Sequence, residues 1–472
     1  MAVGRAPDAA GGIVPPAPPA DSLGRPRTRA PGWALLAAAV WTLAIALRVH
    51  NAVTFPLDGS SDERIGHLDY IQYVRTEWRQ PPPRRNLETW QPPLYYWTMA
   101  AAWAASARWS PRPFDLWAPP QRAVLPLLSS AMGLAAAALA WRVVRRVVPD
   151  DPLAELLALA VVLFAPMHVI VAPWLRSDLL AVLLAAAVVA LLAAQDDLTA
   201  LPATARVGLG VLLGLGLLAK YTGTSAIATV ALCLGAATVT RPGRARAVAV
   251  AAVPIFGLAA AIGGWFYVRH WLLEGKLFWT ALDWLGTFGQ PPGARGAADF
   301  LSFPAAVFLR PWVIDASLVR SVWAGTYATA WFDGQYSFLN HYLPHDMATA
   351  YGRALLVLGV PPTIAMAAGV FEAVACMWRS RRLEPYLPIV VYGAWSVLAY
   401  VHLNVLAPYF SSVQARYLLP AIVPIAVCLA LGAARAPRAL RAVLALDVAV
   451  FVALVTAVFW FQTGRPMFGP AS

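Results

Sequence analysis

Charged side chains are scarce in this chain. Only 13% of its 472 residues are Asp, Glu, Lys or Arg, whereas 60% are hydrophobic. Soluble domains carry roughly 25% charged residues, so an ordinary soluble fold is excluded. Many apolar runs reach the roughly 20 residues that a helix needs to cross a bilayer. The sequence therefore predicts an all-α polytopic membrane protein.

Cysteine and lysine are also rare. Cys233, Cys376 and Cys428 fall inside predicted spans without motif spacing, so we interpret them as small buried hydrophobes rather than disulfides or metal ligands. Lysine occurs only at Lys220 and Lys276, and the net charge of +12 comes from arginine. Such an excess is typical of cytoplasmic loops of membrane proteins. Without any nucleic-acid-binding motif, nucleic acid is not expected as a partner.

The arginine clusters set the predicted topology. If residues 93–108 crossed the membrane, Arg142, Arg145 and Arg146 would lie outside, against the positive-inside rule. We therefore expect 93–108 to lie in or dip into the interface, which places four arginine clusters and the amino end inside and the carboxyl end outside. The eleven predicted spans are 33–49, 121–144, 153–173, 178–194, 206–220, 222–239, 245–268, 351–377, 386–403, 416–434 and 439–461.

The same pattern divides the chain into four parts. Residues 1–30, rich in Pro, Ala, Gly and Arg, are expected to be a disordered basic cytoplasmic tail. Residues 31–270 form a transmembrane module that includes a first outer loop, 50–120. Residues 271–350 form a second outer loop, in which Trp, Tyr, Pro and Gly suit interfacial helices, and 351–472 hold the last transmembrane helices.

The longest polar stretch of the first half is residues 58–97, DGSSDERIGHLDYIQYVRTEWRQPPPRRNLETWQPPLYYW. It opens on the adjacent carboxylates Asp62 and Glu63, followed by His67 and Asp69. Such groups are costly to hold near apolar protein, and transfer to a hydroxyl needs a general base. The stretch is therefore the candidate active site.

A plain helix start also explains the acidic pair, because Ser60 and Ser61 can cap a helix and acids suit its first turn. On a helix, His67 follows Glu63 by four residues, so the two can share a face. That spacing also occurs in zinc helices, but a full metal triad is not evident. We expect His67 to be a hydrogen-bond partner or an acceptor contact.

A second motif, Gln-Pro-Pro-Leu-Tyr-Tyr at 91–96, closes the stretch. Asp-Glu-x-x-x-His followed by Gln-Pro-Pro-Leu resembles the first outer loop of the GT-C glycosyltransferases. It is similar to protein O-mannosyltransferases, with Asp-Glu-x-His and His-Pro-Pro-Leu, and to lipid A aminoarabinose transferases. The resemblance runs from about residue 33 to 435. Further matches are Arg122 in QRAVLPLLSS, Arg176 and Asp178 in LRSDLLAVLL, Lys220 and Tyr221 in LLAKYTG, Arg269 in YVRHWLLEG and Arg416 in QARYLLPAIVP.

The resemblance implies the GT-C fold and an inverting transfer of a hexosyl or pentosyl group. The donor would be a polyprenyl-phosphate sugar, and the acceptor a hydroxyl of a lipid, glycan or protein. The expected place is the outer face of a bacterial inner membrane, among membrane lipids. A first-loop carboxylate would take the acceptor proton, so Asp62 is the predicted base and Glu63 its companion. No cofactor is required by this scheme, and a divalent metal is possible but not favoured.

Cleaving a sugar–phosphate bond needs positive charge on the leaving phosphate. Arg122, Lys220, Arg269 and Arg416 lie at predicted outer ends of spans and are the candidates. Each could instead be an interfacial anchor that snorkels toward lipid headgroups. The other predicted substrate contacts are His67, Glu88, Gln91, Tyr95, Asp178 and Tyr221.

Two groups of residues are possible metal-binding sites. The corner at Asp178 supplies a ligand in metal-dependent relatives, but Arg176 two residues away makes a structural ion pair an equally good explanation. His341, His345 and Asp346 offer ligand atoms, but the proline between the histidines breaks any helix there. We expect loop hydrogen bonding rather than a metal site.

Two other functions remain open from the residues alone. A transporter or flippase of lipid-linked sugars should carry ionisable residues in mid-span. The predicted spans are almost free of them, with Asp447 as the main exception. A non-catalytic scaffold with a GT-C-like fold is the other alternative.

Overall fold

The computed structural model describes residues 31–57, 63–109, 121–286, 289–380 and 383–463. This part is helical and contains no β-strand, only an isolated bridge between Pro292 and Tyr409. Its helices are α1 (Pro31–Thr54), α2 (Asp69–Glu77), α3 (Leu94–Trp109), α4 (Val124–Val147), α5 (Pro152–Phe164), α6 (Pro166–Ile170), α7 (Asp178–Ala193), α8 (Ala203–Ala219), α9 (Gly223–Thr240), α10 (Ala245–Ala259), α11 (Trp265–Glu274), α12 (Ala281–Leu285), α13 (Ala297–Leu301), α14 (Val322–Trp331), α15 (His345–Leu358), α16 (Val360–Ser380), α17 (Tyr386–Leu406), α18 (Ile422–Arg435) and α19 (Arg438–Thr456).

Within the described ranges, 8 helical stretches are long and apolar enough to cross a membrane. They are Pro31–Thr54, Gln121–Val147, Gly223–Thr240, Pro242–Glu274, His345–Arg379, Tyr386–Leu406, Phe410–Arg435 and Arg438–Phe461. The shorter apolar helices α5, α7 and α8 coincide with the other three predicted spans. The chain is therefore a multi-pass membrane protein, and the number of crossings stays a prediction.

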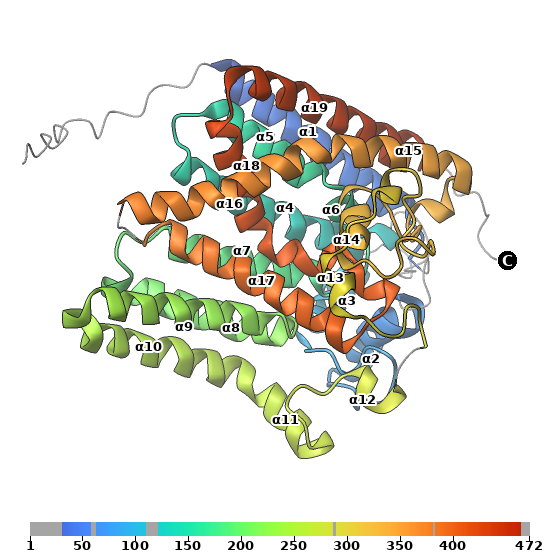
Figure 1. Cartoon of the computed structure of the whole chain (residues 1–472). Coiled ribbons are helices and arrows are strands. Elements are labelled where there is room, and N and C mark those ends of the chain that lie inside the picture. The colour runs from blue at the N-terminus through green and yellow to red at the C-terminus, as the bar shows by residue number, and fades with distance from the viewer. Residues whose placement is uncertain (1–30, 58–62, 110–120, 287–288, 381–382, 464–472) are drawn as a thin grey trace, which may run out of the picture.

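Helix α18 lies at the centre of the bundle and packs against α16, α5 and α4 (Figure 1). Its contact with α16 is very close. A Cβ atom on Gly369 would lie 1.6 Å from the carbonyl oxygen of Cys428, and one on Gly432 would lie 1.8 Å from that of Ala365. Small residues permit such approach between membrane helices. The two glycines fix where α18, and the segment that precedes it, sits in the bundle.

The predicted span 153–173 is broken in the structure. Helix α5 ends at Phe164 and α6 begins at Pro166, because proline lacks an amide hydrogen and disfavours the helical conformation at the residue before it. Buried Arg48 of α1 donates from Nη2 to the Leu163 carbonyl oxygen at 2.7 Å. A cation there satisfies the free carbonyl groups at the helix end.

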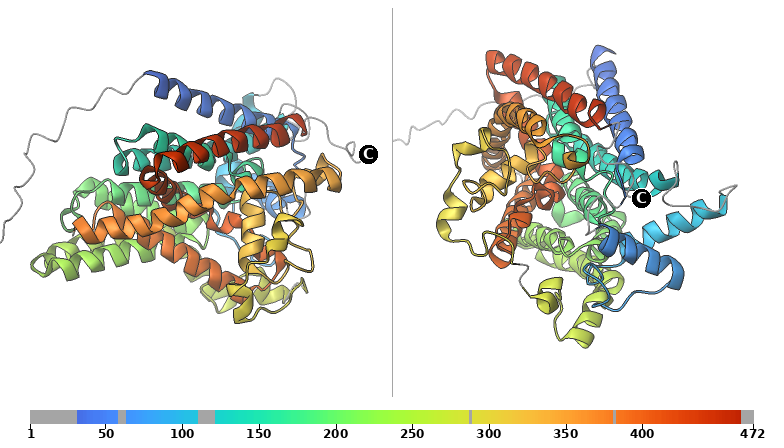
Figure 2. Two further views of the ribbon diagram at one scale, coloured as in Figure 1. Left: turned by 45° about the horizontal axis from the view of Figure 1, so that its top comes forward. Right: turned by 90° about the vertical axis from the view of Figure 1, so that its right-hand side faces the viewer.

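The short elements gather at one end of the bundle, where α2, α12, α13 and α14 lie (Figure 1). Helix α3 follows Pro92-Pro93, a favourable helix start, and projects sideways from this end (Figure 2). At 16 residues it is shorter than a typical spanning helix. Most of α14 is buried, so this part of the second outer loop is packed into the protein rather than lying on its surface.

The predicted cytoplasmic arginine clusters meet at the other end of the bundle. There they pair with acids from neighbouring helix ends, which fixes the clusters relative to one another. The pairs are Arg146–Asp196 at 2.6 Å, Arg241–Asp197 at 2.5 Å, Arg435–Glu372 at 2.8 Å and Arg441–Asp151 at 2.5 Å. The predicted topology requires that these clusters lie at the same end of the bundle, as they do. That this end faces the cytoplasm remains a prediction.

Candidate active site

The candidate site lies at the end of the bundle opposite the arginine clusters. Five pieces of chain meet there: the π-helix Glu63–Leu68, the loop before α3, the start of α7, the corner between α8 and α9, and the 3-10 helix Ala415–Ala421. Asp62, the predicted base, lies outside the described residues. Glu63 opens the π-helix, and its side chain is also outside the described part.

The π-helix is a rare conformation, in which each hydrogen bond spans five residues, and it occurs often at functional sites. Gly66 in this helix allows the Glu88 side chain to lie directly against the backbone. A Cβ atom on Gly66 would come within 2.7 Å of Glu88 Cγ. The close approach brings the loop before α3 onto the helix that carries His67.

His67 is buried between Tyr96 and Glu88. Its Nδ1 lies 2.8 Å from the Tyr96 hydroxyl, and its Nε2 lies 3.8 Å from Glu88 Oε1. Gln91 donates from its amide to Glu88 Oε2, and Ser177 donates to Gln91 Oε1 at 2.8 Å. A buried polar network therefore connects the first outer loop to the start of α7.

The direction of the hydrogen bonds in this network depends on which ring nitrogen of His67 carries the proton. Burial lowers the pKa of His67 well below its usual value, and the positive charge of Arg176 lowers it further. A neutral imidazole has one donor and one acceptor nitrogen. In the tautomer that is protonated at Nε2, that proton would point toward the Glu88 carboxylate 3.8 Å away, and Nδ1 would accept from the Tyr96 hydroxyl. Glu88 would then be the acceptor of the network, as it already is for Gln91.

Asp178 is the centre of a second cluster. Lys220 Nζ lies 2.5 Å from its Oδ1, and Arg416 Nη1 lies 3.3 Å from its Oδ2. Arg416 also donates from Nη2 to the Tyr417 hydroxyl at 2.9 Å, and Lys220 Nζ lies 5.8 Å from the Tyr417 ring centroid. The sequence suggested Arg176 as the partner of Asp178; in the structure, Lys220 and Arg416 from distant parts of the chain pair with it.

Each member of this second cluster stands at an element end. Asp178 begins α7, where a carboxylate is favoured by the helix dipole, and Lys220 follows α8, where a cation is favoured. Only 5% of the Asp178 side chain is exposed, with 16% for Lys220 and 12% for Arg416. Two cations on one carboxylate leave a positive excess in a largely desolvated place, which favours binding of an anion.

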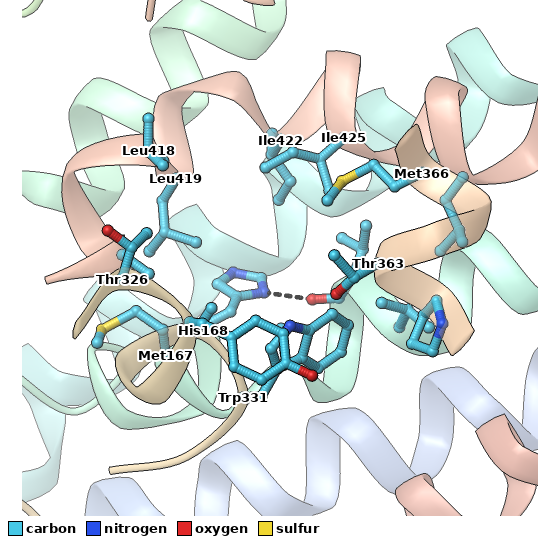
Figure 3. Close-up of a pocket in the computed structure, with 18 of the residues that line it drawn as sticks. Met167, His168, Thr326, Trp331, Thr363, Met366, Leu418, Leu419, Ile422 and Ile425 are labelled. Atoms are coloured by element: carbon cyan, nitrogen blue, oxygen red, sulfur yellow. Dashed lines mark hydrogen bonds between the residues drawn. The ribbon is translucent and has the colours of Figure 1, made fainter. Parts of the chain in front are cut away.

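An apolar cavity of about 360 Å³ lies beside this cluster. Ala415, Leu418 and Leu419 of the 3-10 helix line it, with residues of α6, α14, α16 and α18. In Figure 3, Leu418 and Leu419 lie on one side, and Met167 and Trp331 lie across the cavity. Arg416 stands between two lining positions. The same 3-10 helix therefore joins the cationic cluster to an apolar cavity.

Four predicted contacts occupy supporting positions around the clusters. Tyr95 shares a hydrogen bond of 2.9 Å with Ser129, and Arg122 donates to the Val53 carbonyl oxygen. The other two are Arg269, which donates to the Pro81 carbonyl oxygen at 3.1 Å, and Tyr221, which donates to that of Trp279 at 2.7 Å. The bonds of Tyr95 and Arg122 join helical segments to each other, whereas those of Arg269 and Tyr221 connect α11 and the corner between α8 and α9 to the outer loops.

Three residues of the clusters were missed from the sequence: Tyr96, Ser177 and Tyr417. Successive helical residues point about 100° apart, so only one tyrosine of the pair at 95–96 can face His67, and the motif alone does not say which. Tyr417 directly follows a predicted site residue, and Ser177 directly precedes one. Their position next to predicted site residues was therefore the only sequence signal that could have pointed to Ser177 and Tyr417.

No group of three or more His, Cys, Asp or Glu side chains that could hold a metal occurs in the part of the chain that the structure describes. His345 stacks on Trp312 at 4.6 Å between ring centroids, and His341 packs edge-on against Phe55 at 5.5 Å. Both histidines thus have aromatic neighbours. Metal independence stays a prediction.

No family model and no curated protein sequence matches this chain, but solved structures resemble it. One is the apo oligosaccharyltransferase of Archaeoglobus fulgidus, with a TM-score of 0.54 and 12% identity over 95% of this chain and 57% of that one. Another is ArnT from Cupriavidus metallidurans bound to undecaprenyl phosphate, with a TM-score of 0.51 and 16% identity over 91% of this chain and 65% of that one.

The archaeal oligosaccharyltransferase AglB, in complex with an inhibitory peptide and a dolichol-phosphate, has a TM-score of 0.53 and 13% identity, covering 93% of this chain and 56% of that one. The present chain thus spans less than two thirds of the length of these proteins. At this identity the likeness establishes the fold. The expected GT-C fold is confirmed.

Proposed function

We propose that this GT-C-fold chain is an integral membrane glycosyltransferase that uses a polyprenyl-phosphate sugar. In the proposed reaction, the bond between the anomeric carbon and the phosphate oxygen breaks, and its electron pair stays on the phosphate. The acceptor hydroxyl oxygen forms the new bond with inversion, and its proton passes to a carboxylate. The products are a glycosylated acceptor and a polyprenyl phosphate.

The observation that carries this proposal is the position of the 3-10 helix Ala415–Ala421. It supplies Arg416 to the Asp178–Lys220 cluster and three apolar residues to the adjacent cavity. A lipid phosphate has the same two parts, a charged head and an apolar tail. We place the phosphate beside Lys220 and Arg416 and the first isoprenoid units in the cavity.

The two cations would stabilise charge on the leaving phosphate, since cations aimed at developing charge contribute most in a desolvated site. Asp178 would hold both of them before the donor arrives. Tyr417, bonded to Arg416, would restrict the guanidinium further. The lipids bound in two similar structures, undecaprenyl phosphate in ArnT and dolichol-phosphate in AglB, support this class of donor.

The first outer loop would supply the proton acceptor. Asp62 is the proposed base, five positions before His67 in the chain, with Glu63 holding a sugar hydroxyl or tuning its neighbour. A like-charged neighbour raises a carboxylate pKa and makes it a better proton acceptor. Glu88, positioned by His67 and Gln91, would orient the acceptor. We propose that the site faces the outer side of a bacterial inner membrane.

Product formation tests the proposal. Purified protein would be incubated with a panel of undecaprenyl-phosphate sugars and a cell-envelope extract as acceptor, and free undecaprenyl phosphate would be measured by mass spectrometry. We expect release from one donor, abolished when Lys220 and Arg416 are both replaced by alanine. Arg435→Ala, which removes an arginine at the other end of the bundle, is the control.

A parallel assay in sealed vesicles distinguishes the flippase alternative. If the intact lipid-linked sugar moves between leaflets and no bond is broken, the transferase proposal is wrong. Release that is unaffected by the double substitution would instead contradict the proposed phosphate site.

A further inference from the structure

Asp447 stands near the middle of α19, and neither cluster of the candidate active site includes it. At 1.5 Å per residue, about 14 Å of helix separates it from Arg438 at the start of α19. That length is close to half of the roughly 30 Å thickness of the hydrocarbon core. Helix α19 lies at the margin of the bundle (Figure 1 and Figure 2). A carboxylate at this depth is costly, and such residues in membrane helices usually have a partner or mark a functional site.

The Asp447 carboxylate has no hydrogen-bond donor among the residues that the structure describes. Its Oδ2 is buried and makes no hydrogen bond there. Tyr327 of α14 is close enough for the charge of Asp447 to act on it, but the Tyr327 hydroxyl donates to the Leu356 carbonyl oxygen at 2.7 Å. A buried carboxylate oxygen without a donor is unfavourable. The side chain therefore needs a donor that the described part of the chain does not supply.

Asp447 lies at the border between the buried and the exposed face of α19. It follows Leu444 by three residues and precedes Phe451 by four, and both of these are buried. It also follows Val443 by four residues and precedes Val450 by three, and both of these are exposed. Residues at these spacings share a helix face. The Asp447 side chain is itself only partly buried, so it can be reached from the lipid side.

Depth and charge together define what can supply the donor. A dissolved cation does not enter the apolar core, because an isolated charge is too costly there. A second copy of this chain offers no basic side chain at that depth, since its lysines and arginines lie at the ends of the predicted spans or outside them. A helix of another protein can place a lysine or arginine there, because a helix satisfies its own backbone hydrogen bonds in lipid.

We propose that α19 binds a transmembrane helix of a partner protein that carries a basic side chain at mid-membrane depth. The Asp447 carboxylate accepts a charged hydrogen bond from that side chain. The exposed apolar residues of α19 on the same side, Leu440, Val443, Leu446 and Val450, pack against the partner helix. The contact is independent of the proposed transfer reaction, because Asp447 belongs to neither cluster of the candidate active site.

The test uses the full chain in phosphatidylcholine vesicles, with synthetic leucine-alanine helices of about 20 residues, the length that crosses a bilayer. One helix has a lysine at its centre, a second has leucine there, and a third has its lysine two turns from the centre. Association is measured by energy transfer between fluorophores on peptide and protein. We expect the central-lysine helix to bind about tenfold more tightly than the leucine helix, as for a charged hydrogen bond. The third helix should show no such gain.

Variants of α19 then test the carboxylate itself. Asp447→Leu should remove the preference for the central lysine, and it should fold because it replaces a donor-less carboxylate with an apolar side chain. Leu446→Ala is the matched control, since it removes an exposed neighbour of Asp447. Binding of the lysine and leucine helices should fall alike in this control, so that their ratio does not change. In a charge exchange, Asp447→Lys should prefer a helix with a central aspartate.

Three outcomes overturn the proposal. Equal binding of the lysine and leucine helices to the wild type would show that Asp447 selects no cation. A lysine preference that survives in Asp447→Leu would place the lysine at another group. Self-association of the wild type that is lost in Asp447→Leu would identify a second copy of this chain, rather than another protein, as the occupant. None of these results bears on sugar transfer, which is measured separately.

Discussion

Arg416 and Asp178 are 238 positions apart in the chain, yet Arg416 Nη1 lies 3.3 Å from Asp178 Oδ2 in a largely buried place. Lys220 approaches the other oxygen of the same carboxylate at 2.5 Å. One anion thus holds two cations where we place the donor phosphate. A phosphate that binds there competes with Asp178 for them.

The competition gives a prediction for Asp178→Asn. Loss of the carboxylate leaves two buried cations facing each other, and breaking a buried ion pair costs about 3–5 kcal/mol. The substitution should therefore lower the melting temperature of the lipid-free protein. Undecaprenyl phosphate should then raise the melting temperature of the variant by more than it raises that of the wild type. Both shifts are measured by thermal unfolding in detergent. A smaller lipid-induced rise would place the phosphate elsewhere.

Asp196→Asn provides the control, because the Asp196 side chain is 95% exposed in its pair with Arg146 and an exposed ion pair contributes about 0–1 kcal/mol. Neither the melting temperature nor the lipid-induced rise should change in this variant.

A second prediction concerns the shape of the cation at position 416. Lysine keeps the charge but cannot contact the Asp178 carboxylate and the Tyr417 hydroxyl together as the guanidinium does. Arg416→Lys should weaken undecaprenyl-phosphate binding by roughly tenfold, equivalent to about 1.4 kcal/mol, while the protein stays folded. Binding can be measured by titration with the lipid.

Arg435→Lys, in a 2.8 Å pair with Glu372 at the far end of the bundle, should bind as the wild type does. Equal affinities for both variants and the wild type would exclude Arg416 from the phosphate site.

The sequence predicted where the apolar helices lie, because long apolar runs favour such helices; the number of crossings stays a prediction. It also picked Asp178, Lys220 and Arg416 one at a time, from separate short motifs. It could not predict that they share one cluster, because that depends on how α7, α8 and the 3-10 helix before α18 pack. The glycine contact between α16 and α18, which helps to fix that packing, is not recognisable from spacing alone.

The sequence also could not predict which of Tyr95 and Tyr96 contacts His67. Both follow the double proline, and both are fully buried. The rotation of α3 about its axis decides that Tyr96 faces His67 and Tyr95 faces Ser129. That rotation is set by contacts with α2, α4 and α8. By contrast, the break between α5 and α6 could have been predicted from Ala165-Pro166, because the residue before a proline is biased away from helix.

A third prediction uses the protonation of His67. Burial holds the pKa of His67 well below 6.5. The imidazole therefore stays neutral and does not change charge between pH 6 and 8. His67→Gln keeps a donor for Glu88 but loses the bond to Tyr96. Turnover should fall by the same factor at pH 6 and pH 8. A larger loss of turnover at pH 6 than at pH 8 would show that protonated His67 takes part in the reaction.

A fourth prediction tests the predicted topology. Cysteines introduced near Arg112 and near Arg145, in a chain without Cys233, Cys376 and Cys428, would be exposed to an impermeant thiol reagent in intact cells. The first should react and the second should not, because we expect 93–108 to remain on the outer side. The reverse pattern would contradict the assignment of both ends of the bundle.

The last prediction concerns the proposed base, Asp62. An acceptor hydroxyl is a poor nucleophile at neutral pH, so its proton must be accepted as the new bond forms. Losing a general base usually lowers the rate by roughly 10²–10⁴-fold. Asp62→Asn preserves the size of the side chain but cannot take the proton. We expect turnover to fall on that scale, while undecaprenyl phosphate binds with unchanged affinity.

Glu77→Gln is the control for charge in the same loop region, because Glu77 ends α2, is half-exposed and pairs with Arg79 at 3.3 Å. It should transfer sugar at the wild-type rate. If Asp62→Asn does so too, Asp62 is not the base, and Glu63→Gln becomes the decisive variant. If Asp62→Asn loses donor binding together with turnover, the carboxylate acts in binding and the proton must pass to another group. Glu88 is then the next candidate, because its carboxylate accepts a hydrogen bond from Gln91 and lies beside His67.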